Sequence, residues 1–193
     1  MGELADRRGL ETEVYEPAED SRLLLEATAS EIRDSDRVLE VGTGSGYVAS
    51  ELLSETDPIV IGSDINPHAC RRAQERGVES VQADLVRPFR DTVFDVVLFN
   101  PPYLPRVEAA EMDDWMEEAL TGGETGRAVI EPFIESVGRV LAPGGSVYLV
   151  VSTLTGVDEV RETAGAVGLQ AETVREESYP FEKLLVLHLS PGG

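Results

Sequence analysis

The strongest structural signal in the chain is the segment Phe94-Asp95-Val96-Val97-Leu98-Phe99-Asn100-Pro101-Pro102-Tyr103. Apart from Asp95, the residues before Asn100 are apolar, β-branched or aromatic, which predicts a strand over Phe94–Phe99 that is buried on both faces of a parallel sheet. A proline cannot donate a hydrogen bond to a neighbouring strand, so the Pro-Pro pair must end this strand. Ligands of open α/β sheets bind at the carboxyl ends of the strands. Asn100 is therefore expected at a ligand site.

The groups that follow this strand suit chemistry at an amide or amine nitrogen. Such a nitrogen is a poor nucleophile because its lone pair is delocalised. Carbonyl oxygens that accept its N–H groups orient it and stabilise the charge that develops on attack. Asn100 offers a side-chain carbonyl, Pro101 a backbone carbonyl and Tyr103 a ring face for a planar group. The alternative is a strand that simply ends in a Pro-Pro turn.

The length and charge of the chain limit its partners. Its 193 residues fit one domain, and 37 acidic against 16 basic residues give a net charge of −21 at pH 7. Lys183 is the only lysine. An acid-rich, lysine-poor surface is expected of a protein kept soluble in concentrated salt, as in a halophilic archaeon, and an acidic surface that faces a partner is the second interpretation. Free nucleic acid is a poor candidate ligand, because no basic stripe could replace its counterions.

Cysteine and histidine usage predicts neither a disulfide framework nor a metal site. Cys70 is the single cysteine, and His68 and His188 are far apart in the sequence. No apolar run approaches about 18 residues and the N-terminus is charged, so we expect neither a membrane span nor a secretory signal. A cytoplasmic location is therefore expected.

A glycine-rich turn follows the first predicted strand, Arg37–Val41. The turn Gly42-Thr43-Gly44-Ser45-Gly46 precedes a helical pattern, and this order lets backbone N–H groups approach a ligand closely. Its third glycine falls one position earlier than in the dinucleotide pattern Gly-x-Gly-x-x-Gly. Glu40 at the strand end would repel a pyrophosphate and attract a cation. The turn therefore favours S-adenosylmethionine (SAM), whose sulfonium and amino groups are cationic.

The second predicted strand, Ile59–Asp64, ends in an acid about 20 residues after the glycine turn, the position at which a carboxylate commonly holds the ribose hydroxyls. Asn66 as N-cap, Pro67 in the first turn and Gly77 beyond the end delimit the helix that follows. His68 and Cys70 are interpreted as ordinary residues of this helix.

The third predicted strand, Val78–Ala83, is followed by Asp84 and Leu85. Asp84 is placed to accept from an adenine amino group, and the Leu85 N–H to reach the adenine ring. Either could instead be an ordinary loop residue. An acid at the end of each of three consecutive strands is a more specific pattern than any one of them.

The first residues, 1–13, are polar and are expected to form a loose lead-in. Pro17 then suits the first turn of a helix that would extend to Arg33. The cluster from Tyr15 to Asp20 is denser in acids than a helix start requires. It is either a helix start or a wall of the cofactor site.

Residues 104–124 form a long acidic connection at the ligand edge. It is either a lid or substrate grip, or a surface helix that packs Trp115 onto the core. The next helix is expected to bury Ile130 through Leu141 at helical spacing and to end at Pro143-Gly144-Gly145.

The C-terminal part predicts the strand Ser146–Ser152, a helix that starts near Val157 and ends at Gly168, and the strands Leu169–Val174 and Leu184–Leu189. The short connection at Tyr179 to Lys183 leaves no room for a helical crossover, so the last two strands are expected to be antiparallel. Residues 14–193 are expected to form a single domain.

A set of motifs in order makes the chain resemble the HemK-type glutamine methyltransferases, in particular the short eukaryotic and archaeal branch without the bacterial N-terminal domain. The motifs are Tyr15-Glu16-Pro17-Ala18-Glu19-Asp20, Glu40-Val41-Gly42-Thr43-Gly44-Ser45-Gly46, Asp64-Ile65-Asn66-Pro67, Asp84-Leu85, Asn100-Pro101-Pro102-Tyr103 and Gly122-Gly123-Glu124-Thr125-Gly126-Arg127. One departure is Ser21, where the branch has threonine; the hydroxyl is kept. The resemblance implies a class I SAM-dependent methyltransferase fold, α/β and Rossmann-like, with a seven-stranded, mostly parallel sheet in the order 3-2-1-4-5-7-6 and an antiparallel last strand.

The resemblance also implies the site residues and the cofactor SAM. The implied catalytic residues are Asn100, Pro101, Pro102 and Tyr103. The implied cofactor-binding residues are Tyr15, Pro17, Asp20, Ser21, Glu40, Gly42, Thr43, Gly44, Gly46, Asp64, Ile65, Asp84, Leu85 and Asn100.

The activity that the resemblance implies is methylation of the glutamine N5 in the Gly-Gly-Gln loop of a class I translation termination (release) factor. It further implies a small zinc-binding activator subunit, which we expect to add a strand at the sheet edge Val78–Ala83. Three alternatives stay open: an adenine-N6 methyltransferase of DNA or RNA, a protein lysine methyltransferase, and an inactive SAM-binding scaffold.

Overall fold

The computed structural model describes residues 19–55, 57–103 and 125–192. The predicted lead-in at 1–13, the cluster residues Tyr15 and Pro17, and the connection 104–124 lie outside these ranges. So do the first three residues of the Gly122–Arg127 motif.

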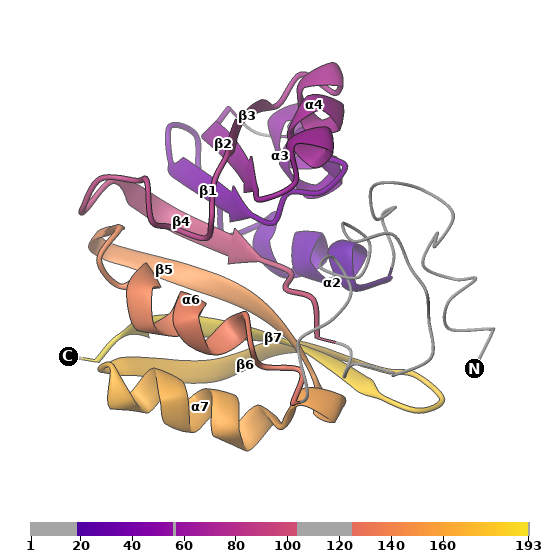
Figure 1. The fold of residues 1–193 in the computed structure, drawn as a ribbon, viewed down its shortest axis with the longest axis vertical. Helices are drawn as coiled ribbons and strands as arrows, with labels where there is room; N and C mark the ends of the chain where they lie inside the picture. Colours follow the sequence, from indigo (N-terminus) through magenta and orange to yellow (C-terminus); the bar gives the residue numbers. More distant parts are fainter. Residues whose placement is uncertain (1–18, 56, 104–124, 193) are drawn as a thin grey trace.

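One seven-stranded sheet organises the fold, in the order β3-β2-β1-β4-β5-β7-β6 (Figure 1). β7 runs antiparallel to β5 and to β6, and the ladders from β3 through β5 are parallel. This topology confirms the predicted sheet. The strands are β1 (Arg37–Val41), β2 (Ile59–Asp64), β3 (Glu79–Gln82), β4 (Phe94–Phe99), β5 (Leu141–Ser152), β6 (Leu169–Ser178) and β7 (Lys183–Pro191).

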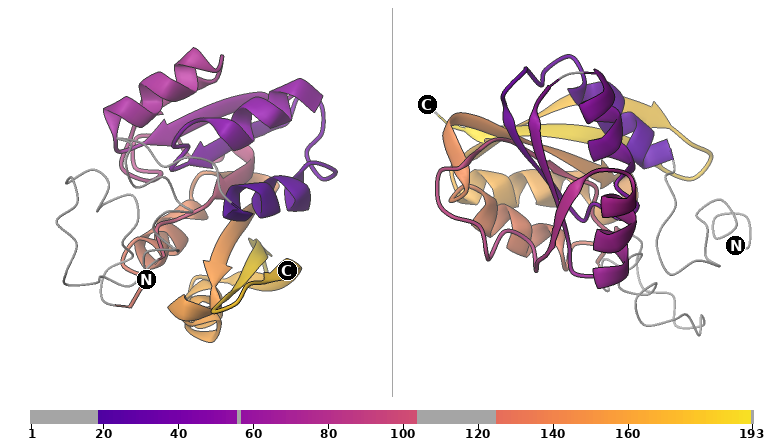
Figure 2. Two further views of the ribbon diagram at one scale, coloured as in Figure 1. Left: turned by 90° about the vertical axis from the view of Figure 1, so that its right-hand side faces the viewer. Right: turned by 90° about the horizontal axis from the view of Figure 1, so that it is seen from above.

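Helices cover both faces of the sheet (Figures 1 and 2). One face carries α2 (Glu19–Thr28), α3 (Tyr47–Glu55) and α4 (Pro67–Glu75), and the other carries α6 (Ile130–Val137) and α7 (Val157–Ala166). The short 3-10 helix η1 (Thr153–Thr155) continues β5. None of the helices in the described ranges has the length and apolar character that a membrane crossing requires.

β4 separates two hydrophobic cores, as its apolar sequence predicts. Val97 and Phe99 face the core under α6 and α7, whereas Val96 and Leu98 face the core under α2 and α3. The Phe99 ring packs against the Phe133 ring of α6, with 4.5 Å between ring centroids. β4 is therefore held from both sides where it ends at Asn100.

The predicted boundary between the α6 helix and β5 is wrong. The helix ends at Val137, and Leu141 already belongs to β5, where it pairs with Phe94. Pro143-Gly144-Gly145 does not end the helix; it lies within β5 and is accommodated by a register irregularity between Phe94 and Val96. A Cβ on Gly145 would lie 2.8 Å from the Phe94 carbonyl oxygen, so glycine permits the close approach. Val137 and Leu141 are four residues apart, which is also the spacing of inward-facing residues on a helix.

Helix α2 is shorter than predicted, because it ends at Thr28 and not at Arg33. The Thr28 hydroxyl donates to the carbonyl oxygens of Leu24 at 2.9 Å and Leu25 at 3.3 Å. The chain then turns, and the Arg33 N–H donates to the Asp36 carboxylate at 2.8 Å. The Asp36 carboxylate thus satisfies a backbone N–H that a longer helix would have paired with one of its own carbonyls.

The C-terminal hairpin is longer than predicted. β6 extends to Ser178 and β7 begins at Lys183, so the connecting turn is Tyr179–Glu182. Helix α7 ends at Ala166, which leaves Val167 exposed beyond it.

Candidate active site

A cavity of about 310 Å³ lies at the carboxyl ends of β1, β2 and β4. Every predicted site residue in the described ranges lines it, with the exception of Gly46. These lining residues are Asp20, Ser21, Glu40, Gly42, Thr43, Gly44, Asp64, Ile65, Asp84, Leu85, Asn100, Pro101, Pro102 and Tyr103. The strand ends thus bring together residues from Asp20 to Tyr103 in the sequence.

The glycine turn after β1 forms one wall of the cavity. Gly42 and Gly44 have φ angles of 64° and 54°, a region that other residues rarely adopt. A Cβ on Gly42 would also lie 3.3 Å from the Phe99 ring. The Gly44 N–H donates to Asp64 Oδ2 at 2.9 Å, which ties the turn to the end of β2.

Gly46 has a packing role and does not line the cavity. Its φ is 76°, and a Cβ there would lie 2.8 Å from Ala73 Cα and 2.9 Å from Ala73 Cβ. The absence of a side chain at Gly46 allows α4 to pack closely against the start of α3. Gly46 therefore supports the turn from behind.

Glu40 is buried beneath the glycine turn, where it lines the cavity. Its Oε2 accepts from the Thr43 hydroxyl at 2.6 Å and from the Ala49 N–H at 3.3 Å. Burial raises the pKa of Glu40 to about 8, although these two hydrogen bonds oppose the rise. A cation bound in the cavity would stabilise the ionised carboxylate and lower this pKa.

Asp64 is oriented by two backbone groups. Its Oδ2 accepts from Gly44, and its Oδ1 accepts from the Asn66 N–H at 2.8 Å. A carboxylate accepts hydrogen bonds only, so Asp64, which lines the cavity, is the kind of group that holds ligand hydroxyls. Asn66 also caps α4, as predicted, by accepting from the His68 N–H at 2.8 Å.

The opposite wall contains Asp84 and Leu85. Asp84 forms an ion pair with Arg87, which also lines the cavity. Leu85 has a φ of 49°, an uncommon left-handed conformation for a side-chain-bearing residue. This strained backbone lies at the cavity, where the adenine contact was predicted.

Asn100 presents an unpaired carbonyl oxygen. Its Nδ2 donates to Ser21 Oγ at 3.4 Å, whereas its Oδ1 is buried and accepts no hydrogen bond within the described part of the chain. A buried acceptor without a partner is destabilising by about 1–3 kcal/mol. A ligand N–H group in the cavity would satisfy it.

Tyr103 is anchored more deeply than predicted. Its side chain is 3% exposed, it packs in the core under α2, and its hydroxyl donates to Asp20 Oδ2 at 3.5 Å. Asp20 is equally buried, and its Oδ1 accepts from the Ser21 N–H at 2.7 Å. The start of α2 is thereby joined to the segment that follows β4.

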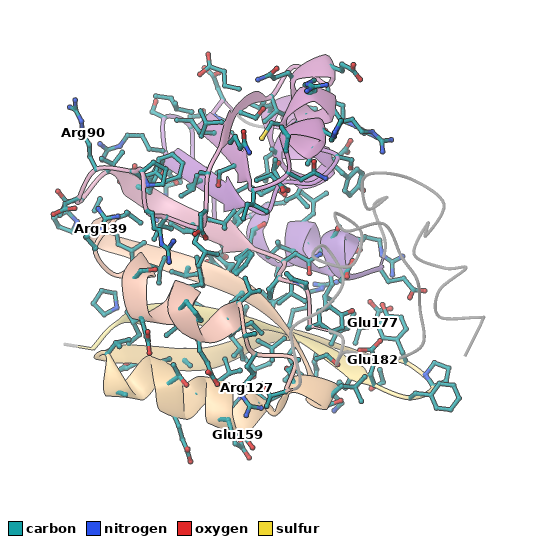
Figure 3. All side chains as sticks on the ribbon, viewed as in Figure 1. Arg90, Arg127, Arg139, Glu159, Glu177 and Glu182 are labelled. Carbon is teal, nitrogen blue, oxygen red and sulfur yellow. The ribbon has the colours of Figure 1, made fainter. Side chains whose placement is uncertain are left out.

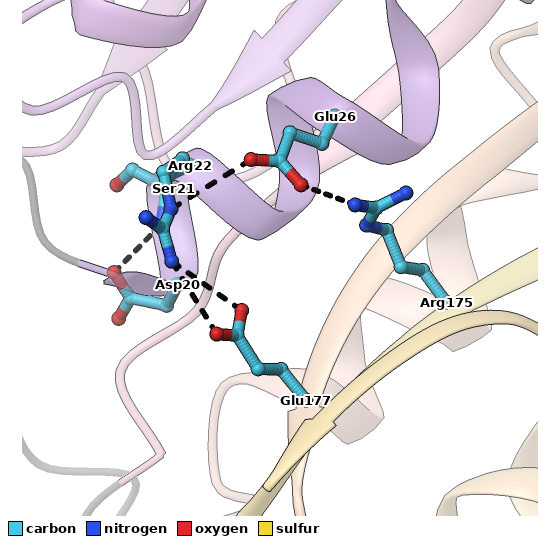
Figure 4. Close-up of polar contacts among 6 residues, drawn as sticks. All are labelled: Asp20, Ser21, Arg22, Glu26, Arg175 and Glu177. Carbon is cyan, nitrogen blue, oxygen red and sulfur yellow. Dashed lines mark hydrogen bonds and ion pairs between the residues drawn. The ribbon is translucent and has the colours of Figure 1, made fainter. Parts of the chain in front are cut away.

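An ion-pair chain fixes helix α2 to the sheet (Figure 4). Arg22 contacts Glu177 of β6 at 3.4 Å and Glu26 of its own helix at 3.8 Å. Glu26 in turn pairs with Arg175 of β6. Because Arg22 directly follows Asp20 and Ser21, these pairs orient the part of α2 that lines the cavity.

The described end of the Gly122–Arg127 motif supports the segment after β4 from the other side. A Cβ on Gly126 would lie 2.6 Å from the Tyr103 carbonyl oxygen. Arg127 donates to the Thr155 carbonyl and to Glu131, at 3.0 Å for the latter. This motif therefore positions Tyr103 and η1 relative to each other.

Several cavity residues were not predicted. They are Val41, Ser45, Tyr47, Val48, Asn66, Ala69, Ala83, Arg87, Phe99, Ala128, Val129 and Pro132. The three-residue spacing between Asp84 and Arg87 could have indicated their ion pair. Nothing in the sequence around Ala128 and Pro132 indicates a cavity, because their position depends on how α6 packs.

The charge of the cavity fits a cationic ligand. Among the described lining residues there is one cation, Arg87, and four carboxyl groups: those of Asp20, Asp64 and Asp84, and that of Glu40, whose ionised form a bound cation would stabilise. A pyrophosphate would be repelled by such a lining, whereas a sulfonium or ammonium group would be attracted. The site therefore fits SAM and does not fit a dinucleotide.

Comparisons with known proteins agree with this geometry. Residues 16–178 match the family described as the methyltransferase small domain. A candidate protein N5-glutamine methyltransferase of Methanocaldococcus jannaschii is 36% identical over 185 residues, which cover 93% of this chain and 92% of that protein. Methyltransferase HEMK2 of Homo sapiens is 35% identical over 194 residues, with 93% and 91% covered.

A solved structure has a similar fold. The E. cuniculi Mtq2–Trm112 complex, described as responsible for the methylation of the eRF1 translation termination factor, contains a chain that superposes with a TM-score of 0.78. That chain is 27% identical, and the match covers 94% of this chain and 100% of that one.

Proposed function

The chain belongs to the methyltransferase small domain family, and we propose that it methylates the side-chain N5 of a glutamine in the Gly-Gly-Gln loop of a class I translation termination factor, in the cytoplasm. The observation that most supports this substrate is the buried Asn100 Oδ1, which lacks a hydrogen-bond donor within the described residues and belongs to a residue that lines the cavity. An amide N–H of glutamine is a donor of the required kind. The relatives' names and the Mtq2–Trm112 complex point to the same reaction.

The residues that would hold SAM are those of the cavity wall. The turn at Gly42 and Gly44 would lie against the cofactor, Asp64 would accept from its ribose hydroxyls, and Asp84 and Leu85 would contact its adenine. Glu40 would face a cationic group. When bound, SAM supplies an electrophilic methyl group.

The chain's own groups would act on the target amide. Asn100 Oδ1 would accept one N–H, and the Pro101 carbonyl would accept the other, so that the nitrogen is held with its lone pair directed into the cavity. The Ser21 hydroxyl contacts Asn100 Nδ2 and so keeps its carbonyl oriented. Attack makes the nitrogen acidic, and its proton can pass to water without a dedicated base.

The two edges of the sheet differ in a way that supports a partner at β3. β6 is charged along its exposed face and has a register irregularity between Thr173 and Arg175, features that block strand addition. β3, the other edge strand, pairs with β2 without a register irregularity, and its Val81 is exposed. We propose that a small zinc-binding activator, the counterpart of Trm112, adds a strand there.

The direct test is a methylation assay with labelled SAM and the chain co-expressed with the activator. The substrates are a termination factor with Gly-Gly-Gln, the same factor with that glutamine replaced by alanine, a lysine-rich peptide and an adenine-containing oligonucleotide. We expect label only on the intact factor. Label on the alanine variant or on the oligonucleotide would refute the proposed substrate.

A further inference from the structure

Two large apolar side chains are exposed on hydrogen-bonded neighbouring segments at the carboxyl end of β5. Phe181 of the β6–β7 turn is 81% exposed and Leu154 of η1 is 46% exposed. The Lys183 N–H donates to Thr153 Oγ1 at 3.0 Å, which joins the two segments. Single exposed apolar residues are common, but a pair on adjoining segments beside a functional site indicates a contact surface. We call Leu154 and Phe181 the hairpin patch.

Phe181 is held on a stiff turn. Pro180 restricts the backbone before it, and the Tyr179 N–H donates to the Glu182 carbonyl at 2.8 Å. The Ser152 hydroxyl donates to Glu182 Oε2 at 2.6 Å, which fixes the turn to the end of β5. An exposed aromatic residue that is already ordered loses little entropy when a partner covers it.

The hairpin patch continues the wall of the active site. Thr155, next to Leu154, and the Tyr103 carbonyl both lie within 3 Å of the Cβ position of Gly126, so the segment after Asn100 packs against η1. β5 pairs with β4 in parallel, and Ser152 pairs with Leu184 of β7. Figure 1 shows the β6–β7 turn on the side to which the β4 arrow points.

The charged side chains near the hairpin patch differ from those at the other end of the strands. Figure 3 shows Glu177 and Glu182 on the hairpin side and Arg90 and Arg139 at the far end. Near the patch, the charges of two acids are compensated, since Glu176 pairs with Lys183 at 3.0 Å and Glu177 pairs with Arg22. Two acids near the apolar patch thus have a cationic partner.

We propose that the hairpin patch docks the polypeptide surface that flanks the target glutamine, an inference that rests on the proposed function. The patch lies outside the cavity lining, so it is not a cofactor contact. The activator is not its occupant, because β3 is at the other end of the sheet from β6 and β7. The patch adjoins the segment that follows Asn100, so a protein substrate whose glutamine reaches Asn100 would lie against it.

The test compares Phe181→Ala with the wild-type enzyme, each with the activator, on two substrates. One is the complete termination factor, and the other is a short Gly-Gly-Gln peptide that cannot span from Asn100 to the patch. We expect kcat/KM for the factor to fall about 10-fold through KM, with kcat, SAM affinity and peptide turnover unchanged. Leu154→Ala should lower kcat/KM for the factor less than Phe181→Ala does. Phe181→Leu should keep most of the wild-type kcat/KM for the factor.

The matched control is Ile59→Ala, since Ile59 is also an exposed apolar residue, 56% exposed at the amino end of β2. This variant should have wild-type kcat/KM for both substrates. Wild-type kinetics for Phe181→Ala on the complete factor would overturn the docking surface. So would equal losses on factor and peptide, which would indicate an effect on the active site itself. Absence of wild-type turnover on the factor would instead refute the proposed function, and the two failures are thus distinguished.

Discussion

Glu40 is buried and lines the cavity, so its ionisation affects both the stability of the fold and the binding of a cation. Its folded pKa of about 8 exceeds the ordinary value of 4.5, so between these pH values the folded chain holds a proton that the unfolded chain has lost. The free energy of unfolding must then decrease as pH rises through this window. The carboxylate form is costly in the empty cavity and favourable next to a cation.

Glu40→Gln is therefore expected to stabilise the ligand-free protein while weakening SAM binding. Glutamine can keep both hydrogen bonds, because Thr43 and Ala49 donate to the same oxygen. The gain in unfolding free energy should grow from pH 5 to pH 8, with an upper limit of about 5 kcal/mol. Denaturant melts across pH measure it, with the partly exposed Glu51→Gln as control. A gain independent of pH would contradict the account.

Individual site residues could be predicted where their position depends on one strand end. Asp64 and Asn100 lie at the cavity because the strands before them are buried and end there. The Asp20–Tyr103 hydrogen bond could not be predicted, because it joins residues 83 positions apart and depends on how α2 packs. Gly46 was assigned to the cofactor, but its packing against Ala73 is visible only in three dimensions.

The close approach of α4 to the glycine turn depends on Gly46, and a comparison with Gly77 separates backbone strain from overpacking. Gly46 and Gly77 both have positive φ, but nothing lies within 4 Å of a Cβ placed on Gly77. Gly77→Ala should therefore reduce the unfolding free energy by about 1–2 kcal/mol through backbone strain alone. Gly46→Ala should add about 1–3 kcal/mol of overpacking. Equal losses in denaturant melts would show that the close approach to Ala73 is unimportant.

The edge strands offer a matched test of partner binding. Val81 on β3 is 43% exposed and Val174 on β6 is 48% exposed. Val81→Asp should abolish co-purification with the activator, because it places a charge in the proposed interface, whereas Val174→Asp should not. The reverse pattern would move the interface to the hairpin side of the sheet.

The bounds of strands with a clear sequence signal at their ends could be predicted, whereas the end of a helix with ambiguous periodicity could not. β1, β2 and β4 have the predicted bounds, because each is a mainly apolar run whose end is marked by a glycine turn, an acid or the Asn-Pro-Pro segment. The end of α6 was misplaced because Val137 and Leu141 are four residues apart and both buried, a spacing that a helix followed by a strand can also produce.

The whole molecule carries a charge of −21 at pH 7, which its ion pairs do not neutralise. Self-repulsion of this size should destabilise the compact state in dilute buffer. Raising KCl from about 0.1 M to about 2 M should therefore raise the melting temperature, and a gain of about 2 kcal/mol corresponds to roughly 4–8 °C. An uncharged osmolyte at the same osmolality should give a smaller rise. A melting temperature that stays constant or falls in KCl would contradict the proposed adaptation to salt.

The proposed reaction requires the side-chain carbonyl of Asn100 to accept a hydrogen bond from the amide that is methylated. The most direct measurement is methyl transfer by Asn100→Ala to the intact termination factor, with SAM affinity measured by calorimetry on the same preparation. We expect a loss of turnover of at least about 100-fold, because the nitrogen loses its main acceptor, with SAM affinity changed less than about 3-fold. Turnover near the wild-type rate, or an equal loss of SAM binding, would contradict it.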